Sequence, residues 1–520
     1  TAVGRGASVK NTTGLCNTSM GGNALACNTT GCYNTAYSRD SLCANTTANS
    51  NTAVGMSALK ANTTGHDNVA VGCGALYNNT TAPDNIAVGY QSQYNTTTGC
   101  QNVSMGWQSM VLNTTGDGNT ALGFKALFTN NGSTPDFNVA VGRQALYSTT
   151  SGYRNVGIGL NAMYTTTTGY ANVGIGPNVL YSNTTGYENV AIGQCALYAN
   201  ISGVENTAIG CGALRSSQTA NANTAVGRSA LGANTSGTRN VALGRNAMCA
   251  NTTACDNVAI GFQSLCTNTT GHSNVAVGKD AGKGITTGSE NTGVGHNTMN
   301  STITGQGNAA FGYSNMTSLT SGATNLALGN SSSPALTTGS NNVTAGAGAG
   351  ISLTTGSNNL LLGHDAGRTG SPGGIVTTGS NRIALGDENI SNAHIQVDWT
   401  VASDQRDKTD FNNLDLGLDF VNKLNPVTYK WDKRSKYDKN LNVTPNGKHK
   451  QDWLDLGFKA QEVEALEIEA GYNKDNKTNL TVDISEDGKQ YSMQYAKFVP
   501  ILVNAIKELK AEIDELKKDR

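Results

Sequence analysis

The chain has 520 residues, a formal net charge of −1 and a charged-residue content of 14%. A charge so close to zero gives no reason to expect nucleic acid as a partner. No apolar run reaches the roughly 18 residues of a membrane-spanning helix, so membrane insertion is not expected either. No signal peptide is visible. Because Thr1 already lies inside a repeat, we expect an N-terminal attachment region to precede it.

Composition divides the chain near residue 400. Only 29 of the first 400 residues are charged, against 42 of the 120 that follow, and 58 of the 63 glycines lie before residue 401. The contrast predicts a repetitive shaft over residues 1–390, a junction over residues 391–402 and an ordinary charged domain over residues 403–520.

A 17-residue repeat fills the shaft, and each copy opens with a phrase of the form N-[TV]-A-[VIL]-G. After a two-residue insertion near Asn131 the series resumes at Asn138 and continues to Asn359. A fixed period of this size indicates a solenoid, because one unit is too short to bury a core by itself. At roughly 4.8 Å per rung, the array of about 23 rungs would be a rod on the order of 110 Å long.

Within one copy, residues 68–84, two strand-like stretches are expected, at residues 69–71 and 75–77. Val69 and Val71 would share one face of a strand and Ala70 would point to the other. The opening asparagine suits a turn and can form a ladder from rung to rung. Each rung offers few large apolar side chains, so a single slender solenoid would be marginal, and we expect chains to associate laterally.

The repeat phrase, as in Asn189–Gly193, resembles the head repeats of trimeric autotransporter adhesins. Those repeats form left-handed β-rolls, three side by side, with a shorter period than this one. Similar arrays also occur in tail fibres. The resemblance implies a mainly β fold, a parallel β-solenoid or β-roll that is trimeric.

All 11 cysteines lie before residue 267, and their spacing leaves several interpretations open. Cys27 with Cys32, and Cys249 with Cys255, could each clip a loop, whereas Cys249 and Cys266 are one period apart and would lie on neighbouring rungs. The cysteines could equally replace small packed residues. Disulfides would imply an oxidising, extracellular setting.

The array carries no motif for a cofactor, a metal site or a glycosidase. The six histidines are scattered without metal-ligand spacing: His66, His272, His296, His364, His394 and His449. The recurrent Asn-Thr-Thr triplet matches the N-glycosylation acceptor, but we interpret it as turn chemistry at a repeated corner. Rows of threonine would also be compatible with binding to sugars or ice.

Four sequence blocks follow the array in order: S-D-Q-R-D-K at residues 403–408, L-N-P-V-T-Y-K-W at 424–431, G-F-K-A-Q-E-V at 457–463, and Tyr495 with P-I-L-V-N-A-I-K-E-L at 500–509. Over about residues 403–518 they resemble the intramolecular chaperone auto-processing domain at the C-terminus of phage tailspikes, tail fibres and endosialidases. The resemblance implies a small α+β domain that trimerises, templates folding of the upstream β-structure and then cuts itself off, without a cofactor.

The same resemblance makes Ser403 the nucleophile, Lys408 its general base and Ala402–Ser403 the cleaved bond. Attack of the serine hydroxyl on the carbonyl of Ala402 would give an ester that water then hydrolyses. Lysine can take the proton only when neutral, so burial or a nearby cation such as Arg406 would help. Asp407 stands where family members carry an apolar residue, and its charge would favour the protonated amine.

Four further residues lie in family motifs: Asp404, Arg406, Gln461 and Glu462. We expect Asp404 and Arg406 to be structural, and the resemblance assigns no role to Gln461 and Glu462. Autoproteolysis is the only enzymatic activity implied, and no external substrate is predicted.

The chain closes with a predicted long helix over residues 498–518. Apolar residues recur at spacings of four and three: Leu502, Ile506, Leu509, Ile513 and Leu516. This heptad seam predicts either a short coiled coil or an amphipathic helix that packs on the domain core. The family resemblance favours a three-stranded coiled coil.

The combined modules indicate a homotrimeric viral tail fibre for host attachment, found on the virion, with a cell-surface receptor that could be a glycan. A cellular surface adhesin or extracellular filament built from the same modules is the alternative. A polysaccharide-degrading tailspike is a third possibility, although the array contains no non-repetitive catalytic insert.

Overall fold

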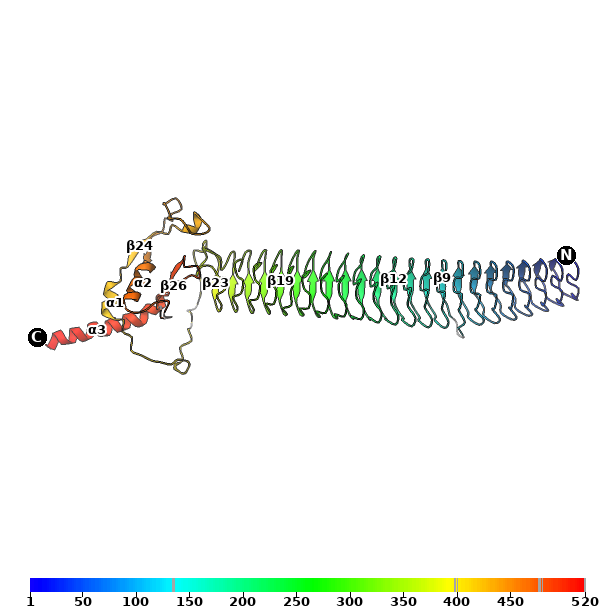
Figure 1. The fold of residues 1–520 in the computed structure, drawn as a ribbon, viewed down its shortest axis with the longest axis horizontal. Coiled ribbons are helices and arrows are strands. Elements are labelled where there is room, and N and C mark those ends of the chain that lie inside the picture. The colour runs from blue at the N-terminus through cyan, green and yellow to red at the C-terminus, as the bar shows by residue number, and fades with distance from the viewer. Residues whose placement is uncertain (133–135, 397–398, 400, 476–477, 479, 519–520) are drawn as a thin grey trace. The chain divides into compact units, whose positions relative to one another are not determined.

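The computed structural model describes residues 1–132, 136–396, 399, 401–475, 478 and 480–518, so part of the predicted junction lies outside the described residues. The chain divides into two compact units, Thr1–Thr304 and Gly305–Arg520. The predicted parallel β-solenoid is confirmed, and its 23 strands match the predicted number of rungs. Each rung contributes one short strand, drawn as one arrow in Figure 1.

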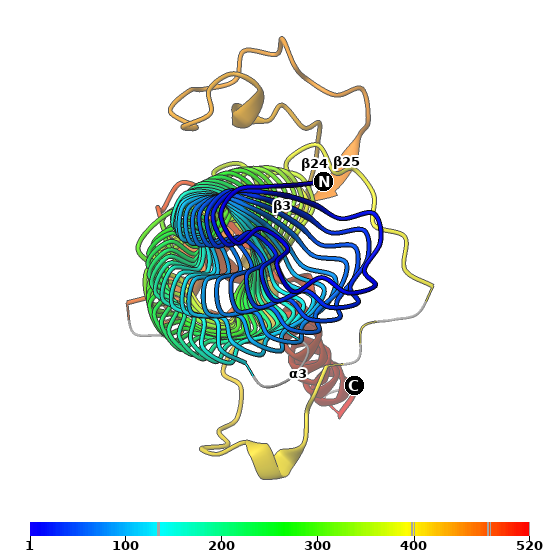
Figure 2. The ribbon, with the colours of Figure 1, turned by 90° about the vertical axis from the view of Figure 1, so that its right-hand side faces the viewer.

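The first unit contains 18 of these strands. They are β1 (Ala2–Val3), β2 (Thr18–Met20), β3 (Thr35–Tyr37), β4 (Thr52–Val54), β5 (Val69–Val71), β6 (Ile86–Val88), β7 (Val103–Met105), β8 (Thr120–Leu122), β9 (Val139–Val141), β10 (Val156–Ile158), β11 (Val173–Ile175), β12 (Val190–Ile192), β13 (Thr207–Ile209), β14 (Thr224–Val226), β15 (Val241–Leu243), β16 (Val258–Ile260), β17 (Val275–Val277) and β18 (Thr292–Val294). Neighbours pair in parallel and in register, as Val69 with Ile86. In an end-on view the blue-to-green rungs follow one another with a gradual offset (Figure 2).

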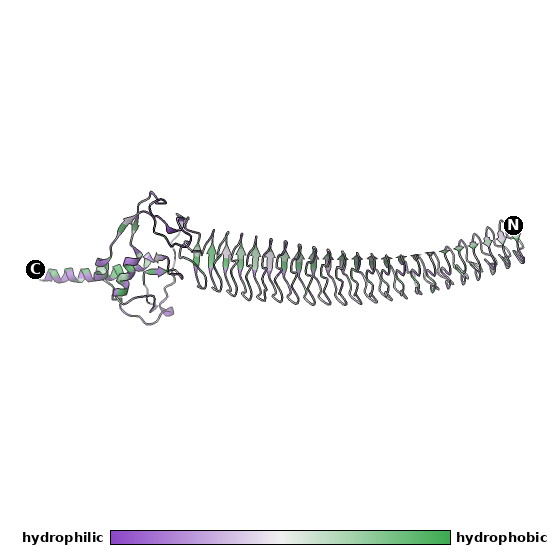
Figure 3. Ribbon diagram, turned by 45° about the horizontal axis from the view of Figure 1, so that its top comes forward, coloured by the Kyte–Doolittle hydropathy of each residue, from purple (hydrophilic) through white to green (hydrophobic). Residues whose placement is uncertain are grey.

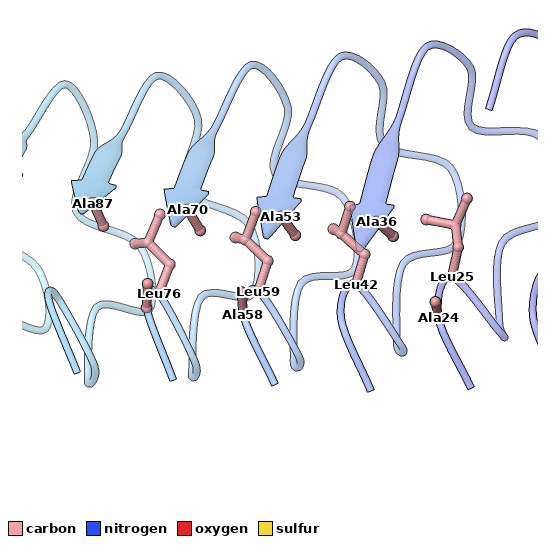
Figure 4. Packing of buried hydrophobic residues seen from close by; sticks show 11 residues of the cluster. Ala24, Leu25, Ala36, Leu42, Ala53, Ala58, Leu59, Ala70, Leu76 and Ala87 are labelled. Atoms are coloured by element: carbon pink, nitrogen blue, oxygen red, sulfur yellow. The ribbon is translucent and has the colours of Figure 1, made fainter. Parts of the chain in front are cut away.

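The core of the first unit is two rows of small and branched side chains. Figure 4 shows the strand alanines Ala53 and Ala70 beside the leucines Leu59 and Leu76 of the following turns. All four are fully buried. Alanine fits because the two walls of so short a rung lie close together, and the leucine fills the remaining space. Val69 and Val71 therefore point outward, on the face opposite Ala70, as the alternation predicts.

The second predicted strand of each rung is absent from the described copies, so the expectation for residues 75–77 is wrong. Leu76 has a left-handed φ of 50°, and its counterpart Leu59 has the same value. The Leu76 N–H still donates to the next rung, to the Ser92 carbonyl, at 3.0 Å. The conformation turns the leucine into the core, where burial offsets the cost of a positive φ for a side chain that ordinarily avoids it.

Two columns of buried asparagine run along the rungs. In the first, Asn51 Oδ1 accepts the Asn68 backbone N–H at 3.1 Å, and the Asn51 amide donates to the Gly65 carbonyl, 14 residues further along the chain, at 2.9 Å. In the second, the Asn62 amide donates to Asn45 Oδ1 at 3.0 Å and to the same Gly65 carbonyl at 2.9 Å. Each such carbonyl thus receives one amide from each column.

Many asparagines of the second column are those that open Asn-Thr-Thr triplets. Asn45 and Asn62 open such triplets and are fully buried. The hydroxyl of the following threonine, Thr63, donates to the Thr80 carbonyl of the next rung at 3.0 Å. Turn and ladder chemistry therefore explain the triplets whose asparagine is buried, and those buried amides offer no place for a glycan; Asn11 and Asn95, which open two other triplets, are not buried.

The two-residue insertion near Asn131 interrupts the spacing but leaves the columns joined. Asn119 and Asn138 are 19 residues apart, and Asn138 still donates its N–H to Asn119 Oδ1 at 3.0 Å. At the place of the usual carbonyl acceptor, Asp136 Oδ2 accepts from the amides of Asn130 (2.9 Å) and Asn119 (3.3 Å). A side-chain carboxylate thus replaces a backbone carbonyl at this corner.

Aromatic side chains form ladders on the outer surface. The rings of Tyr147, Tyr164, Tyr181 and Tyr198 stack on successive rungs at centroid distances of 5.0, 5.3 and 5.2 Å. Each inner ring of the ladder has a neighbour on both faces. The ladder therefore stabilises the stack and presents mainly ring edges to solvent.

One disulfide is present among the described cysteines. Cys249 and Cys266, one period apart, are bonded with a Cα–Cα distance of 5.0 Å. Cys255 and Cys27 have free thiols. Of the pairings that spacing left open, the structure thus has the bond between adjacent rungs rather than the loop clip.

The second unit continues the repeat and adds the C-terminal domain. Its solenoid strands are β19 (Ala309–Phe311), β20 (Leu326–Leu328), β21 (Val343–Ala345), β22 (Leu360–Leu362) and β23 (Ile383–Leu385). The domain then contains η1 (Gln405–Asp407), α1 (Leu418–Lys423), β24 (Val427–Tyr429), η2 (Arg434–Lys436), β25 (Asp455–Gly457), α2 (Ala460–Glu469), β26 (Val482–Ile484), β27 (Tyr491–Met493), η3 (Tyr495–Lys497) and α3 (Phe498–Lys518). The expected small α+β domain ending in a long helix is confirmed.

The domain core forms where α1, α2, the β26–β27 hairpin and the start of α3 meet. Its buried members are Leu416, Phe420, Val463, Val482, Phe498 and Ile501. Glu467 on α2 is also buried and accepts the Thr481 N–H at 2.7 Å. This bond fixes the start of the hairpin against α2. Among the described helices, none is long and apolar enough to cross a membrane.

Candidate autoprocessing site

The structure brings together the two residues predicted to cut the chain. Lys408 Nζ donates to Ser403 Oγ at 2.6 Å. The short 3₁₀ turn η1 lies between them and shortens the path: the Asp407 N–H donates to the Asp404 carbonyl, and the Lys408 N–H to the Gln405 carbonyl, both at 3.2 Å. A lysine amine within hydrogen-bond reach of a serine hydroxyl is the contact that a Ser–Lys mechanism requires.

Asp404 organises this turn. Its carboxylate accepts the Arg406 N–H at 2.9 Å and holds the Arg406 guanidinium, with the closest contact at 2.5 Å. Hydrogen bonds from Arg406 lower the pKa of Asp404, and the carboxylate in turn raises the pKa of Arg406. Asp404 and Arg406 thus contribute contacts within the turn, and their structural role stays a prediction.

Two conditions considered for activating Lys408 are not met within this chain. Residues 401–410 are all exposed, so burial does not desolvate the amine. The Arg406 charge is paired with Asp404, which leaves it little influence on Lys408. Lys408 Nζ is close enough to Ser403 Oγ to act as its base, but that role would require water to be excluded and the neutral amine to be favoured.

Gln461 and Glu462 do not join this site in the described contacts. Both lie at the start of α2, where the Glu462 carboxylate accepts a hydrogen bond from Lys459 Nζ at 2.6 Å. This pair lies in the first turn of the helix, where a carboxylate also suits the helix dipole. Their place in the family motif is thus compatible with a role in building α2.

Two clusters of histidine and aspartate have the geometry to hold a cation, which the sequence pattern did not reveal. In the first unit, His66 and Asp67 lie beside Asp84, one period later. In the second unit the members are His364, Asp365 and Asp387. Linear spacing missed them because stacking of the rungs brings together residues 17 or more positions apart. Arg368 already pairs with Asp365 at 3.0 Å, so the second cluster is partly neutralised without a metal.

Comparison with known families bears directly on this region. Residues 403–472 match the family model Peptidase_S74, described as chaperone of endosialidase, and the match begins at Ser403. Residues 403–472 thus form a chaperone-of-endosialidase domain. No curated protein and no solved structure matches the chain. A parallel β-solenoid followed by this domain suggests a protein of the tail-fibre or tailspike type.

The C-terminal domain also makes contacts, beyond the matched residues, that sequence patterns did not indicate. Glu486, in the loop of the β26–β27 hairpin, accepts the Thr377 N–H of the last solenoid rung at 3.1 Å. Gln490, four residues later, accepts the Gly370 N–H at 3.1 Å. A glutamate in a hairpin loop has no sequence signature for such a role, because its partners lie more than 100 residues away.

Proposed function

We propose that the protein is a homotrimeric fibre that attaches to a host surface, and that its chaperone-of-endosialidase domain aligns three chains before cutting itself off. The observation that carries this proposal is the match over residues 403–472 together with the Ser403–Lys408 contact at the first residues of the match. A bond cut at that point would release the whole domain from the solenoid.

Helix α3 supports trimerisation. Phe498, Ile501 and Ala505 pack into the domain core and are buried. The heptad seam lies elsewhere on the helix and is exposed, with Ile506 and Leu516 at 65% and 67%. Figure 3 shows green apolar residues alternating with purple polar ones along the helix. Copies of α3 are the occupant that suits the seam, because its spacing is that of a coiled coil.

The outward face of the solenoid strands supports side-by-side association. The fourth repeat position carries large apolar residues that remain about one-third exposed, as Ile192 and Ile209 do at 36% and 37%. Repetition of such residues rung after rung makes a continuous apolar stripe, which soluble monomers rarely expose. A stripe with the same period on a second and third copy of this chain would cover it.

Attachment to a host receptor, on a virion or another extracellular surface, is the part of the proposal that rests on the module combination alone. The aromatic ladders pack ring face against ring face, so a sugar would have to bind at their edges or along the polar corners. A glycan array probed with the purified oligomer tests this part, with binding above a rung-deleted control as the expected result.

Light scattering tests the assembly itself. The mass of the purified protein should be three times that of the mature chain. A stable monomer at micromolar concentration would contradict the trimer and, with it, the fibre. If the protein is a trimer that binds neither glycans nor cells, the assembly part of the proposal stands and the attachment part is rejected.

A further inference from the structure

The last rung of a solenoid has an open edge, because no further rung accepts its hydrogen bonds. In the array the donors are regular: the Thr354 N–H and hydroxyl both donate to the Thr377 carbonyl, at 2.8 and 3.0 Å, and the Thr355 N–H donates to the same atom at 3.3 Å. On the last rung the equivalent donors belong to Thr377 and Thr378. Unpaired amides at such an edge cost stability and invite other strands.

Glu486 accepts these three donors. Its Oε2 atom receives the Thr377 N–H at 3.1 Å, the Thr378 N–H at 3.1 Å and the Thr377 hydroxyl at 2.6 Å. They are the counterparts of three donors of the preceding rung, where the Gly356 N–H also donates to the Thr377 carbonyl, at 3.4 Å. One carboxylate oxygen thus takes the place of the threonine carbonyl that a further rung would supply.

The second oxygen of Glu486 takes the place of another carbonyl. In most of the array the turn glycine abuts the carbonyl of the equivalent glycine or alanine in the next rung. Gly356 abuts the Gly379 carbonyl in this way, and Gly379 in turn abuts Glu486 Oε1. The first-position amide normally points at this carbonyl, as Asn359 does at 2.9 Å. Here the first position holds Arg382, whose guanidinium lies 3.6 Å from Oε1.

Charge and burial agree with this geometry. Partial burial opposes ionisation of Glu486, yet the hydrogen bonds from Thr377 and Thr378 and the Arg382 charge outweigh it, and the pKa is lowered. Elsewhere in the chain, Asp136 replaces a carbonyl at the junction of the asparagine columns. The sequence thus uses a carboxylate as a substitute for a rung carbonyl at two independent places.

We propose that the β26–β27 hairpin is a surrogate rung, and that Glu486 is the positioning residue by which the chaperone domain recognises and seals the open end of the solenoid. Its partner is the last rung of this chain. The surrogate gives the first rung to fold a fixed edge with the correct acceptor pattern. Because parallel pairing between distant segments is slow, a preformed edge should speed growth of the stack.

Hydrogen exchange on the full chain carrying Ser403→Ala tests the docking without relying on cleavage. Glu486→Ala should speed exchange of the Thr377 and Thr378 amides by roughly tenfold, the scale of one charge-assisted hydrogen bond. Glu469→Ala is the matched control, since Glu469 pairs with Lys423 at the domain surface and, among the described residues, has no contact with the last rung. Unchanged exchange at Thr377 and Thr378 in the Glu486 variant would overturn the proposal.

A second measurement covers the case in which Glu486→Ala does not fold. Glu486→Gln keeps one acceptor oxygen but loses the charge that faces Arg382, so its exchange should be intermediate. Refolding after dilution from denaturant should then be slower for Glu486→Gln than for the Glu469 control. Equal refolding rates together with unchanged exchange would reject the surrogate rung, whereas failure of self-cleavage would affect only the proposed function.

Discussion

Lys408 Nζ and Ser403 Oγ are 2.6 Å apart across a single 3₁₀ turn, at the residue where the chaperone domain begins. A hydroxyl that close to an amine can pass its proton directly. The contact forms within one chain and the surrounding residues are exposed, so we propose that assembly activates the lysine.

Ser403→Ala and Lys408→Ala should each abolish cleavage and leave the trimer intact. Nucleophile and base act as one unit, so loss of either should reduce the rate by more than about a hundredfold. N-terminal sequencing of the products checks this, with Ser403 expected as the first residue of the wild-type fragment. Ser391→Ala, which changes an exposed serine at the start of the junction, is the control. Cleavage that persists in the Ser403 variant would dismiss the mechanism.

Assembly should depend on the exposed seam of α3. Ile506→Glu places a charge among three copies of the seam and should convert trimers to monomers or aggregates. Light scattering measures the change. Lys510→Glu alters charge at another exposed position of the same helix and should leave the mass at three chains. Trimers of the Ile506 variant would show that the seam has no part in assembly.

The chaperone domain should matter for folding and little for the finished fibre. Deletion of residues 403–520 should give insoluble or monomeric chains, because nearly identical rungs can pair out of register and exposed edges aggregate. Removal of the same segment by cleavage after assembly should leave a heat-resistant trimer, because unfolding must break many interfaces. Normal trimers from the deletion variant, seen by light scattering, would refute the folding role.

A single substitution in a buried asparagine column should lower the stability of the solenoid. Asn206 accepts from Asn223 through its Oδ1 atom and donates to the Ala220 carbonyl at 2.7 Å. Asn206→Ala leaves these buried groups unpaired, and we expect a loss of about 1–3 kcal/mol in the free energy of unfolding. Asn221→Ala changes an exposed asparagine nearby and should cost much less. Denaturant titration compares the two, and equal losses would contradict the role of the column.

The raised pKa of Asp136 predicts that its effect on stability changes with pH in the direction opposite to that of most carboxylates. Burial raises its pKa, while hydrogen bonds from Asn130 and Asn119 only partly compensate and the nearby Asp117 charge raises it further. A carboxylic acid whose pKa is raised in the folded state lowers the free energy of unfolding least at pH values below its unfolded-state pKa. Stability is lost as the pH rises from there through the folded-state pKa. Asp136→Asn should therefore raise the unfolding temperature at pH 7 and have less effect near pH 4. An unchanged difference between the two pH values would contradict this account.

The solenoid could be predicted from the sequence because a strict period repeats the same pattern of residue types in every rung. Val69, Ala70 and Val71 alternate as a strand does, and the structure agrees. The stretch around Leu76 was misread because leucine between alanine and tyrosine suits a strand, whereas the compact core demands a left-handed turn there. Local propensity was overruled by packing.

The candidate site was predictable only where its residues are close in sequence. Ser403 and Lys408 are five residues apart and belong to one motif. Glu486 was not predictable, because its role follows from the carbonyl pattern of a rung that ends more than 100 residues earlier. The heptad spacing of the α3 seam is visible in the sequence. Which apolar residues instead pack into the core, as Ile501 and Ala505 do, is seen only in the folded domain.

The insertion corner beside Asn131 has a consequence for how such a protein can diversify. Two extra residues enter the sequence there, yet Asn138 still donates to Asn119, and Asp136 accepts the Asn119 amide where a backbone carbonyl does so in other rungs. A second corner absorbs a longer insertion, since Asn359 and Arg382 are 23 residues apart and still bonded. Insertions can therefore accumulate at corners of the solenoid without interrupting the asparagine columns. Such a chain can change what it displays without changing how it is held together.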